Sequence, residues 1–81
     1  MKFYCTHSIN DRMKENSSFS SFINNSVTAF LNGNFRHISE ADREANESET
    51  NFQMGAYIYQ DEKIWIIKNE DIITVLHPDE Y

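Results

Sequence analysis

The chain has 81 residues and a formal charge of −6, from thirteen Asp and Glu against seven Lys and Arg. This length fits one small domain, and six Phe, four Tyr and one Trp can supply much of its core. The acidic balance and the scattered Lys and Arg argue against direct nucleic-acid binding. A single cysteine excludes an intrachain disulfide and a Cys-x-x-Cys zinc site.

No stretch of the sequence approaches the roughly 18 apolar residues that a membrane span needs. The N-terminal segment MKFYCTHSIN also has no apolar stretch of the kind found in export signals. We therefore expect a cytoplasmic protein with no membrane partner.

The segment KFYCT alternates aromatic and small residues, which predicts a short strand. Phe3 and Cys5 would lie on one face of this strand, and Tyr4 and Thr6 on the other. The next segment, SIND at residues 8–11, has the Ser-x-x-Asp form of a capping box. It predicts a short helix directly after the strand.

Apolar side chains recur with helical spacing in the next segment, at positions 19, 22, 23, 27, 30 and 31. They predict a helix over about residues 18–32, with Ser17 or Ser18 as its N-cap and Gly33 as its stop. The rest of this helix is polar but uncharged, so packing against a sheet must supply most of its stability.

A second capping box, SEAD at residues 39–42, predicts a helix that runs to about Glu49. Its apolar residues, Ala41 and Ala45, would form a narrow seam. Its five acidic residues are Glu40, Asp42, Glu44, Glu47 and Glu49.

The last third of the chain holds three β-branched and aromatic runs, MGAYIYQ, KIWIIKN and IITVLH. The breaks between them are short enough for hairpins, so we expect an antiparallel meander. The fold class is therefore α+β, in the order β-α-α-β-β-β, with the sheet covered on one face by the helix of about residues 18–32. Ile64, Ile66, Ile73 and Val75 would face this helix, whereas Trp65 and Ile67 would make the other face unusually apolar.

The candidate reactive residues do not form a catalytic or metal-binding pattern. His7, His37 and His77 lie in three different elements with no metal-ligand spacing, and are most simply loop or strand-end side chains. Cys5 reads as a small apolar strand residue. We therefore expect no enzymatic activity, no metal and no cofactor.

Acidic pairs also occur at the predicted turns and at the chain end: Asp61 with Glu62, Glu70 with Asp71, and Asp79 with Glu80. If the acidic helix and any of these turns lie on one side, they form a surface of one sign that binds a basic groove. Alternatively, the charge only keeps a small domain in solution. Apolar anchors for a partner would be Tyr57, Tyr59, Trp65 and Tyr81.

The segments YCTHSINDRM, FSSFINNSV, NGNFRHISEADREANE, GAYIYQDEKIWII and TVLHPDEY resemble a family of small proteins from plasmids and prophages of Gram-positive bacteria, known as plasmid-related proteins. The resemblance covers nearly the whole chain. The positions that match the family pattern are Thr6, Asn32-Gly33, Glu40, Asp42, Asn46, residues 64–67 and residues 74–81. The chain departs from it at Asn34, where the family has Asp, and in the short KNED segment, where the family has a longer basic stretch.

The resemblance implies a mobile genetic element as the setting, but no activity. Small acidic proteins of such elements often inhibit host defence nucleases, and anti-CRISPR proteins are similar in size and charge. We therefore expect a DNA mimic that binds a basic nuclease, such as a CRISPR effector, and blocks its nucleic-acid groove. Two alternatives are a homodimeric regulatory or structural protein of a phage or plasmid that buries the Trp65 and Ile67 face, and a RelE/ParE-like fold without the basic active face.

Overall fold

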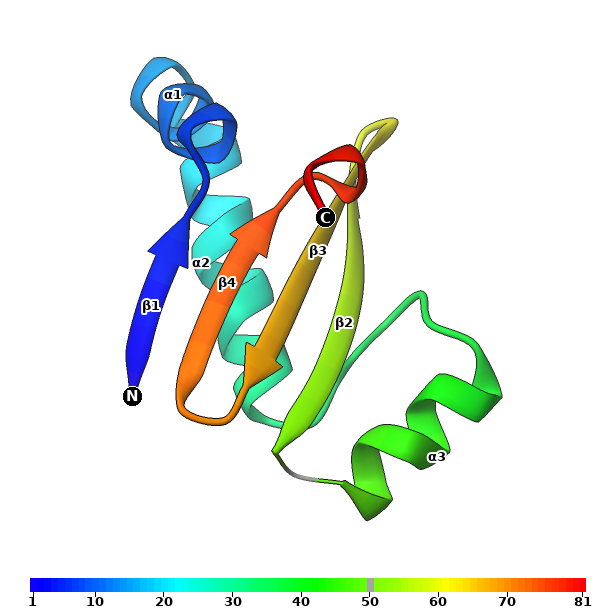
Figure 1. Ribbon diagram of the computed structural model, residues 1–81. Helices are drawn as coiled ribbons and strands as arrows, with labels where there is room; N and C mark the ends of the chain where they lie inside the picture. The colour runs from blue at the N-terminus through cyan, green and yellow to red at the C-terminus, as the bar shows by residue number, and fades with distance from the viewer. Residues whose placement is uncertain (50) are drawn as a thin grey trace.

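The computed structural model describes residues 1–49 and 51–81, which form a four-stranded sheet with three α-helices (Figure 1). The elements in chain order are β1 (Lys2–Cys5), α1 (His7–Glu15), α2 (Ser17–Leu31), α3 (Glu40–Ser48), β2 (Phe52–Tyr59), β3 (Glu62–Asn69), β4 (Ile72–Leu76) and the 3₁₀ turn η1 (Pro78–Glu80). Strands β2, β3 and β4 pair antiparallel in sequence order. The predicted α+β class and antiparallel meander are therefore confirmed.

Strand β1 completes the sheet by pairing with β4, and this pairing is parallel. The strand order is β1-β4-β3-β2, so the first and last strands of the chain are neighbours. Because neighbouring parallel strands end on the same side of a sheet, the residues that follow β1 and β4 lie side by side. This pairing brings the N-terminal end of α1 to the C-terminal turn η1.

Helix α1 starts one residue earlier than the predicted capping box. Thr6 is its N-cap residue, and the Ser8 side chain bonds to the C-terminal turn instead. The capping box at residues 8–11 was therefore wrong, because a tertiary contact takes the serine hydroxyl. Helix α2 is capped by Asn16 and not by the predicted Ser17 or Ser18, because the Asn16 side chain accepts a hydrogen bond from the Phe19 backbone N–H.

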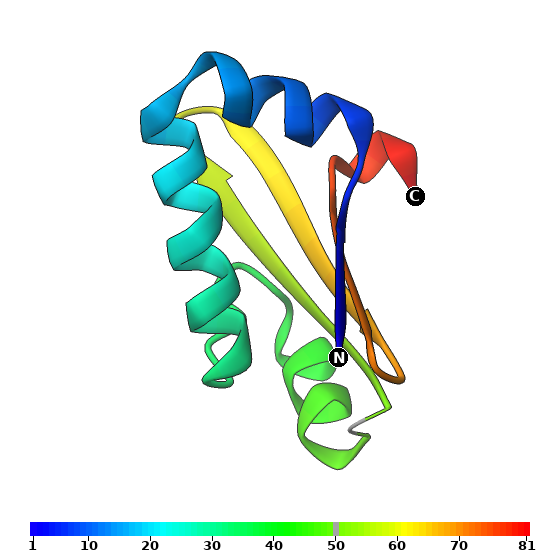
Figure 2. The same cartoon turned by 90° about the vertical axis from the view of Figure 1, so that its left-hand side faces the viewer.

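Helix α2 covers one face of the sheet, as predicted, and Figure 2 shows it beside the sheet seen from the edge. The predicted core residues of β3 and β4 are all buried against it. The core cluster comprises Ile9, Phe19, Ile23, Phe30, Phe35, Tyr57, Ile64, Ile66, Ile73 and Val75. Leu31, the last residue of the predicted apolar stripe, is instead half exposed.

Helix α3 lies beside β2 and is held by a polar contact. Ala41 and Ala45 are exposed, so the predicted alanine seam was wrong. Asn46 is the buried residue of this helix. Its side-chain amide donates to the Met54 carbonyl at 2.7 Å and accepts from the Met54 N–H at 3.0 Å. The amide thus satisfies β2 backbone groups that would otherwise lie unpaired at a sheet edge.

The segment before α3 also pairs with the outer edge of β2. The Ala56 N–H donates to the Phe35 carbonyl, and the His37 N–H donates to the Ala56 carbonyl, each at 3.0 Å. This parallel bridge and the Asn46 amide together cover the edge of β2. Helix α3 is therefore fixed at one end of the molecule by the backbone pairing of the segment before it and by the side-chain amide of Asn46.

The sheet face away from α2 is only partly covered. The ring of Tyr81, directly after η1, lies 5.8 Å from the ring of Trp65, and Ile67 is buried although it lies on this face. Between η1 at one end and α3 at the other, no helix covers the sheet in Figure 2. Among the described residues, no helix combines the length and the apolar character that crossing a membrane requires.

Candidate functional site

Six polar side chains meet at the edge where β1 and β4 end. They come from α1 and its N-cap, the start of β3 and the C-terminal segment, and we call them the clasp: Thr6, Ser8, Arg12, Glu62, His77 and Glu80. The parallel pairing of β1 with β4 explains the meeting, since it places Thr6 and His77 at the ends of adjacent strands.

His77 is at the centre of the clasp. Its Nδ1 lies 2.8 Å from the Ser8 Oγ, and its Nε2 lies 2.6 Å from a Glu62 carboxylate oxygen. Its backbone N–H donates to Glu80 at 2.7 Å. The imidazole therefore joins α1, β3 and η1, which are far apart in the sequence.

The Glu80 carboxylate lies at the N-terminal end of α1. One oxygen accepts from the Thr6 hydroxyl and the other from the Ser8 hydroxyl, each at 2.9 Å. Helix α1 has no acidic residue in its first turn and no side-chain cap from Thr6. Glu80 therefore supplies the negative charge that a helix N-terminus favours. The His77 backbone N–H lowers the pKa of Glu80, and both hydroxyls lower it further.

The Glu62 carboxylate accepts hydrogen bonds from the Arg12 guanidinium and from the His77 ring. The Arg12 hydrogen bond is the main reason that the pKa of Glu62 is lowered, and the His77 contact lowers it further. The Arg12 guanidinium also lies over the Phe19 ring, 4.6 Å from its centroid. This cation–π contact ties the clasp to the core.

The hydrogen-bond partners fix one part of the proton arrangement around His77. An ionised carboxylate can only accept, so Nε2 of His77 donates to Glu62. The Ser8 hydroxyl has one proton, and it lies within hydrogen-bond distance of both Glu80 and Nδ1 of His77. In either arrangement of that proton, the imidazole lies between Glu62 and the pair of Ser8 and Glu80.

The chain of contacts from Ser8 through His77 to Glu62 has the order of a nucleophile, a base and an acid. Here the Ser8 hydroxyl also donates to Glu80, which places negative charge beside the position where an oxyanion would develop. No pocket is found among the described residues. What the contacts do in this structure is hold α1, β3 and η1 together.

Sequence patterns did not reveal the clasp. The partners of Ser8 are 69 and 72 residues away, and no local spacing connects them. His77 does directly follow β4, as the sequence indicated, but its hydrogen bonds to Ser8 and Glu62 were not predicted. The clasp follows from the parallel pairing of β1 with β4, and the sequence patterns did not predict this pairing.

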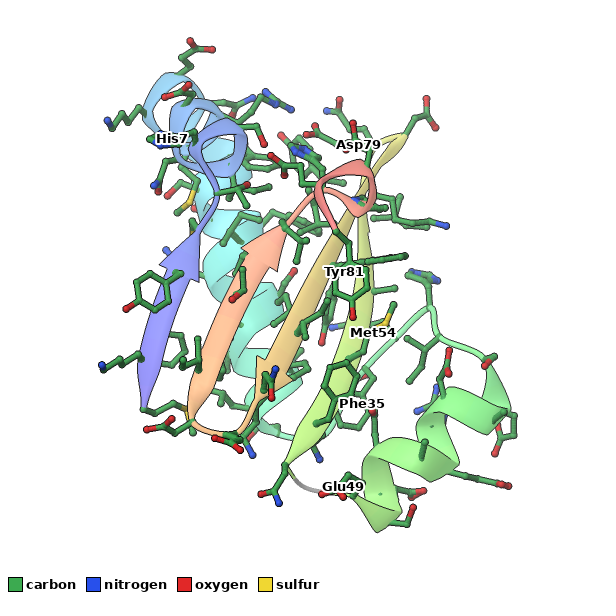
Figure 3. All side chains as sticks on the ribbon, in the orientation of Figure 1. His7, Phe35, Glu49, Met54, Asp79 and Tyr81 are labelled. Atoms are coloured by element: carbon green, nitrogen blue, oxygen red, sulfur yellow. The ribbon has the colours of Figure 1, made fainter. Side chains whose placement is uncertain are left out.

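A second charged region lies at the opposite end of the sheet. It combines α3 with the turn between β3 and β4, and we call it the acidic end: Glu40, Asp42, Glu44, Glu47, Glu49, Glu70 and Asp71. The Glu70 N–H donates to the Asn51 carbonyl, so the β3–β4 turn lies beside the segment that leaves α3. Figure 3 places Glu49 at this end and Asp79 at the other.

The carboxylates of the acidic end are exposed and poorly compensated. Residues 40–49 hold five acids and one base, Arg43, which gives a net charge of −4. Arg43 approaches Glu40 only at 3.9 Å. Glu40, Glu44 and Glu47 are spaced by four and three residues, so they share one face of α3. In the described part of the chain, no ion pair involves the acids other than Glu40.

Two predicted partner-binding acids do not belong to this region. Asp61 and Glu62 lie at the other end of β3, and Glu62 is occupied by Arg12 and His77. The structure therefore brings the acidic helix together with one of the acidic turns, the β3–β4 turn, and places the other acidic pairs elsewhere. The length of β3 gives the reason, because its first and last residues are at opposite ends of the sheet.

The predicted aromatic anchors differ in exposure. Tyr57 is 2% exposed, and its hydroxyl donates to the Asn34 carbonyl at 2.8 Å, so it cannot be an exposed anchor. Burial raises the pKa of Tyr57. Tyr59 packs on Phe19 with ring centroids 5.3 Å apart. Of the four, only Tyr81 is largely exposed, while Trp65 is half-buried beneath it.

No group of three or more His, Cys, Asp or Glu within the described residues could hold a metal ion. Burial raises the pKa of the Cys5 thiol, which packs against the core. Comparisons with protein-family models, with curated proteins and with solved structures found no match to this chain.

Proposed function

We propose that the protein is a non-enzymatic inhibitor that binds a basic, nucleic-acid-binding protein through the acidic end. The observation that carries this proposal is the grouping of seven exposed acids on α3 and the β3–β4 turn. In its specific form, the partner is a defence nuclease of the bacterial host such as a CRISPR effector, and the setting is a plasmid or prophage.

The mechanism is occlusion. A groove lined by Lys and Arg binds nucleic acid largely through phosphates, so a dense array of carboxylates can occupy the same groove. Exposed ion pairs are worth only about 0–1 kcal/mol each, so several must act together. The stripe of Glu40, Glu44 and Glu47 on a helix held at both sides is suited to this role, because the backbone that carries it is already ordered before binding.

A homodimer is the second candidate, and it has its own supporting observation. The sheet face away from α2 exposes large apolar side chains, of which Tyr4 is 54% exposed and Ile58 is 43% exposed. Such a face can be buried against a second copy. In this reading the acidic end would limit further association through charge repulsion.

A challenge experiment in cells tests the proposal. Cells that carry an active CRISPR nuclease and its target plasmid would express the wild type or one of two charge variants. The acidic-end variant replaces Glu40, Glu44 and Glu47 with Lys, and the control variant replaces Asp11, Asp61 and Asp79 with Lys. Each variant changes three acids to bases and so moves the net charge from −6 to 0.

We expect the wild type and the control variant to protect the plasmid, and the acidic-end variant to fail although it is folded. Equal loss of plasmid protection in both variants would show that inhibition depends on net charge and not on the acidic end. Absence of protection by the wild type against several nuclease types would refute the nuclease proposal, and sedimentation would then test the homodimer.

A further inference from the structure

The sheet face away from α2 has an exposed apolar half that lies directly beside the acidic end. The strand register defines two rows across this half. The outer row contains Lys2, Ile72, Asn69 and Phe52, and the next row contains Tyr4, Thr74, Ile67 and Met54. Phe52 and Ile72 are each about two-fifths exposed. Figure 3 shows Met54 on this face, between Tyr81 and the acidic end.

Two acidic segments lie near this half. Helix α3 runs beside β2, held through the Asn46 contact to Met54, and Glu70 and Asp71 follow the outer row at the turn. Lys2 is at the opposite corner, on β1. A bound segment would therefore meet apolar surface in the middle, carboxylates toward α3 and the turn, and a positive charge on the far side.

We infer that this half-face and the acidic end together bind one amphipathic basic segment of the partner protein. Apolar side chains of that segment lie on Phe52 and Ile72, and its Lys or Arg residues lie against α3 and the β3–β4 turn. This inference rests on the proposed function and specifies the chemistry of its partner. It also explains how affinity is reached, because exposed ion pairs contribute little without an apolar contact.

The charge pattern favours such a segment over a second copy as the occupant. Two copies carry −6 each, so packing their half-faces together brings two acidic borders close to each other. A basic segment has the opposite sign, and its orientation is fixed because Lys2 repels its basic side toward α3.

The test uses the full chain and three synthetic peptides of equal length, with affinities measured by calorimetry. The first peptide alternates Lys and Leu as an amphipathic helix, the second replaces Leu with Ser, and the third replaces Lys with Glu. The protein variants are the double change Phe52→Thr with Ile72→Thr, the matched control Leu31→Thr, and the acidic-end variant. Leu31 is similarly exposed but lies at the end of α2.

We expect the Lys/Leu peptide to bind the wild type about tenfold or more tightly than the Lys/Ser peptide. The double variant should lose this difference, the Leu31→Thr control should keep it, and the acidic-end variant should bind neither peptide. Amide chemical shifts on the wild type should move at β2, β4 and α3.

Three results would overturn the inference. Equal affinity for the Lys/Leu and Lys/Ser peptides would remove the apolar contact and leave the acidic end as the whole site. Binding of the Glu/Leu peptide, or self-association that the double variant abolishes, would assign the face to a different occupant. If both Lys-containing peptides bind the acidic-end variant as tightly as they bind the wild type, the proposed function itself is refuted.

Discussion

The two ends of the sheet use charge in opposite ways. At the clasp, Glu62 and Glu80 are each held by two or more hydrogen-bond donors that come from distant parts of the chain. At the acidic end, seven carboxylates are exposed, and Arg43 supplies their only ion pair among the described residues. The same residue types therefore stabilise the fold at one end and stay available to a partner at the other.

This contrast teaches that net charge alone does not locate a binding surface. When a hydrogen-bond donor of the folded state lowers the pKa of a carboxylate, that contact stabilises the fold, and removing the carboxylate lowers the free energy of unfolding. A carboxylate with no such group contributes little to the fold. The predictions below test this division, from the largest expected effect to the smallest.

The packing beneath the clasp should be the most sensitive point. Phe19 is fully buried and contacts Tyr59 and Arg12, so Phe19→Ala should lower the free energy of unfolding by about 3–5 kcal/mol. Phe52→Ala near the acidic end should cost less than about 1.5 kcal/mol. Urea unfolding followed by the fluorescence of Trp65, the sole tryptophan, measures both. Equal losses would contradict the difference between the two ends.

Within the charged groups, Glu62 should matter most. Glu62→Gln removes the charge that Arg12 and His77 share, and should cost about 1–3 kcal/mol. Glu47→Gln on α3 should change stability by less than about 0.5 kcal/mol. Thermal unfolding at neutral pH compares them, and a Glu62→Gln protein as stable as wild type would exclude a structural role for the clasp.

Acid should weaken the clasp selectively. The pKa of Glu62 is lowered from 4.5 mainly by Arg12, and that of Glu80 from 4.5 mainly by the His77 N–H. Because the folded state binds these protons more weakly, their contribution is complete above the unfolded pKa and is lost as pH falls through the folded pKa. The free energy of unfolding should therefore decline below about pH 5. Glu62→Gln should flatten this decline, and Glu44→Gln should not.

The smallest effect should come from the chain end. Tyr81→Ala removes the ring that lies against Trp65 and should cost about 0.5–1.5 kcal/mol. Tryptophan emission should shift to longer wavelength, because Trp65 becomes more exposed. An unchanged emission spectrum would show that the Tyr81 ring does not cover Trp65 in solution.

The sequence predicted most of the fold because local signals were strong there. The helical spacing from Phe19 to Phe30 and the β-branched runs of β3 and β4 each specify an element without tertiary information. The buried Asn46 was not predictable, because its role depends on a backbone edge that only tertiary structure places beside it.

The candidate site was predicted only in part. The four acids of α3 and Glu49 directly after it were identified from composition and spacing, and they lie at the acidic end. Glu62 and Tyr57 were assigned to the same surface, although one is part of the clasp and the other is buried. Sequence patterns cannot separate paired from exposed carboxylates when the pairing partners are 15 to 74 residues away.

The most direct test of the account is a competition measurement with a purified RNA-guided nuclease, in which wild type, Glu62→Gln and the acidic-end variant displace its DNA. All three proteins are compared at a temperature where each is folded. We predict that Glu62→Gln displaces DNA within about twofold of wild type, whereas the acidic-end variant is weaker by at least about tenfold. A Glu62→Gln protein as impaired as the acidic-end variant would contradict the separation of the two ends.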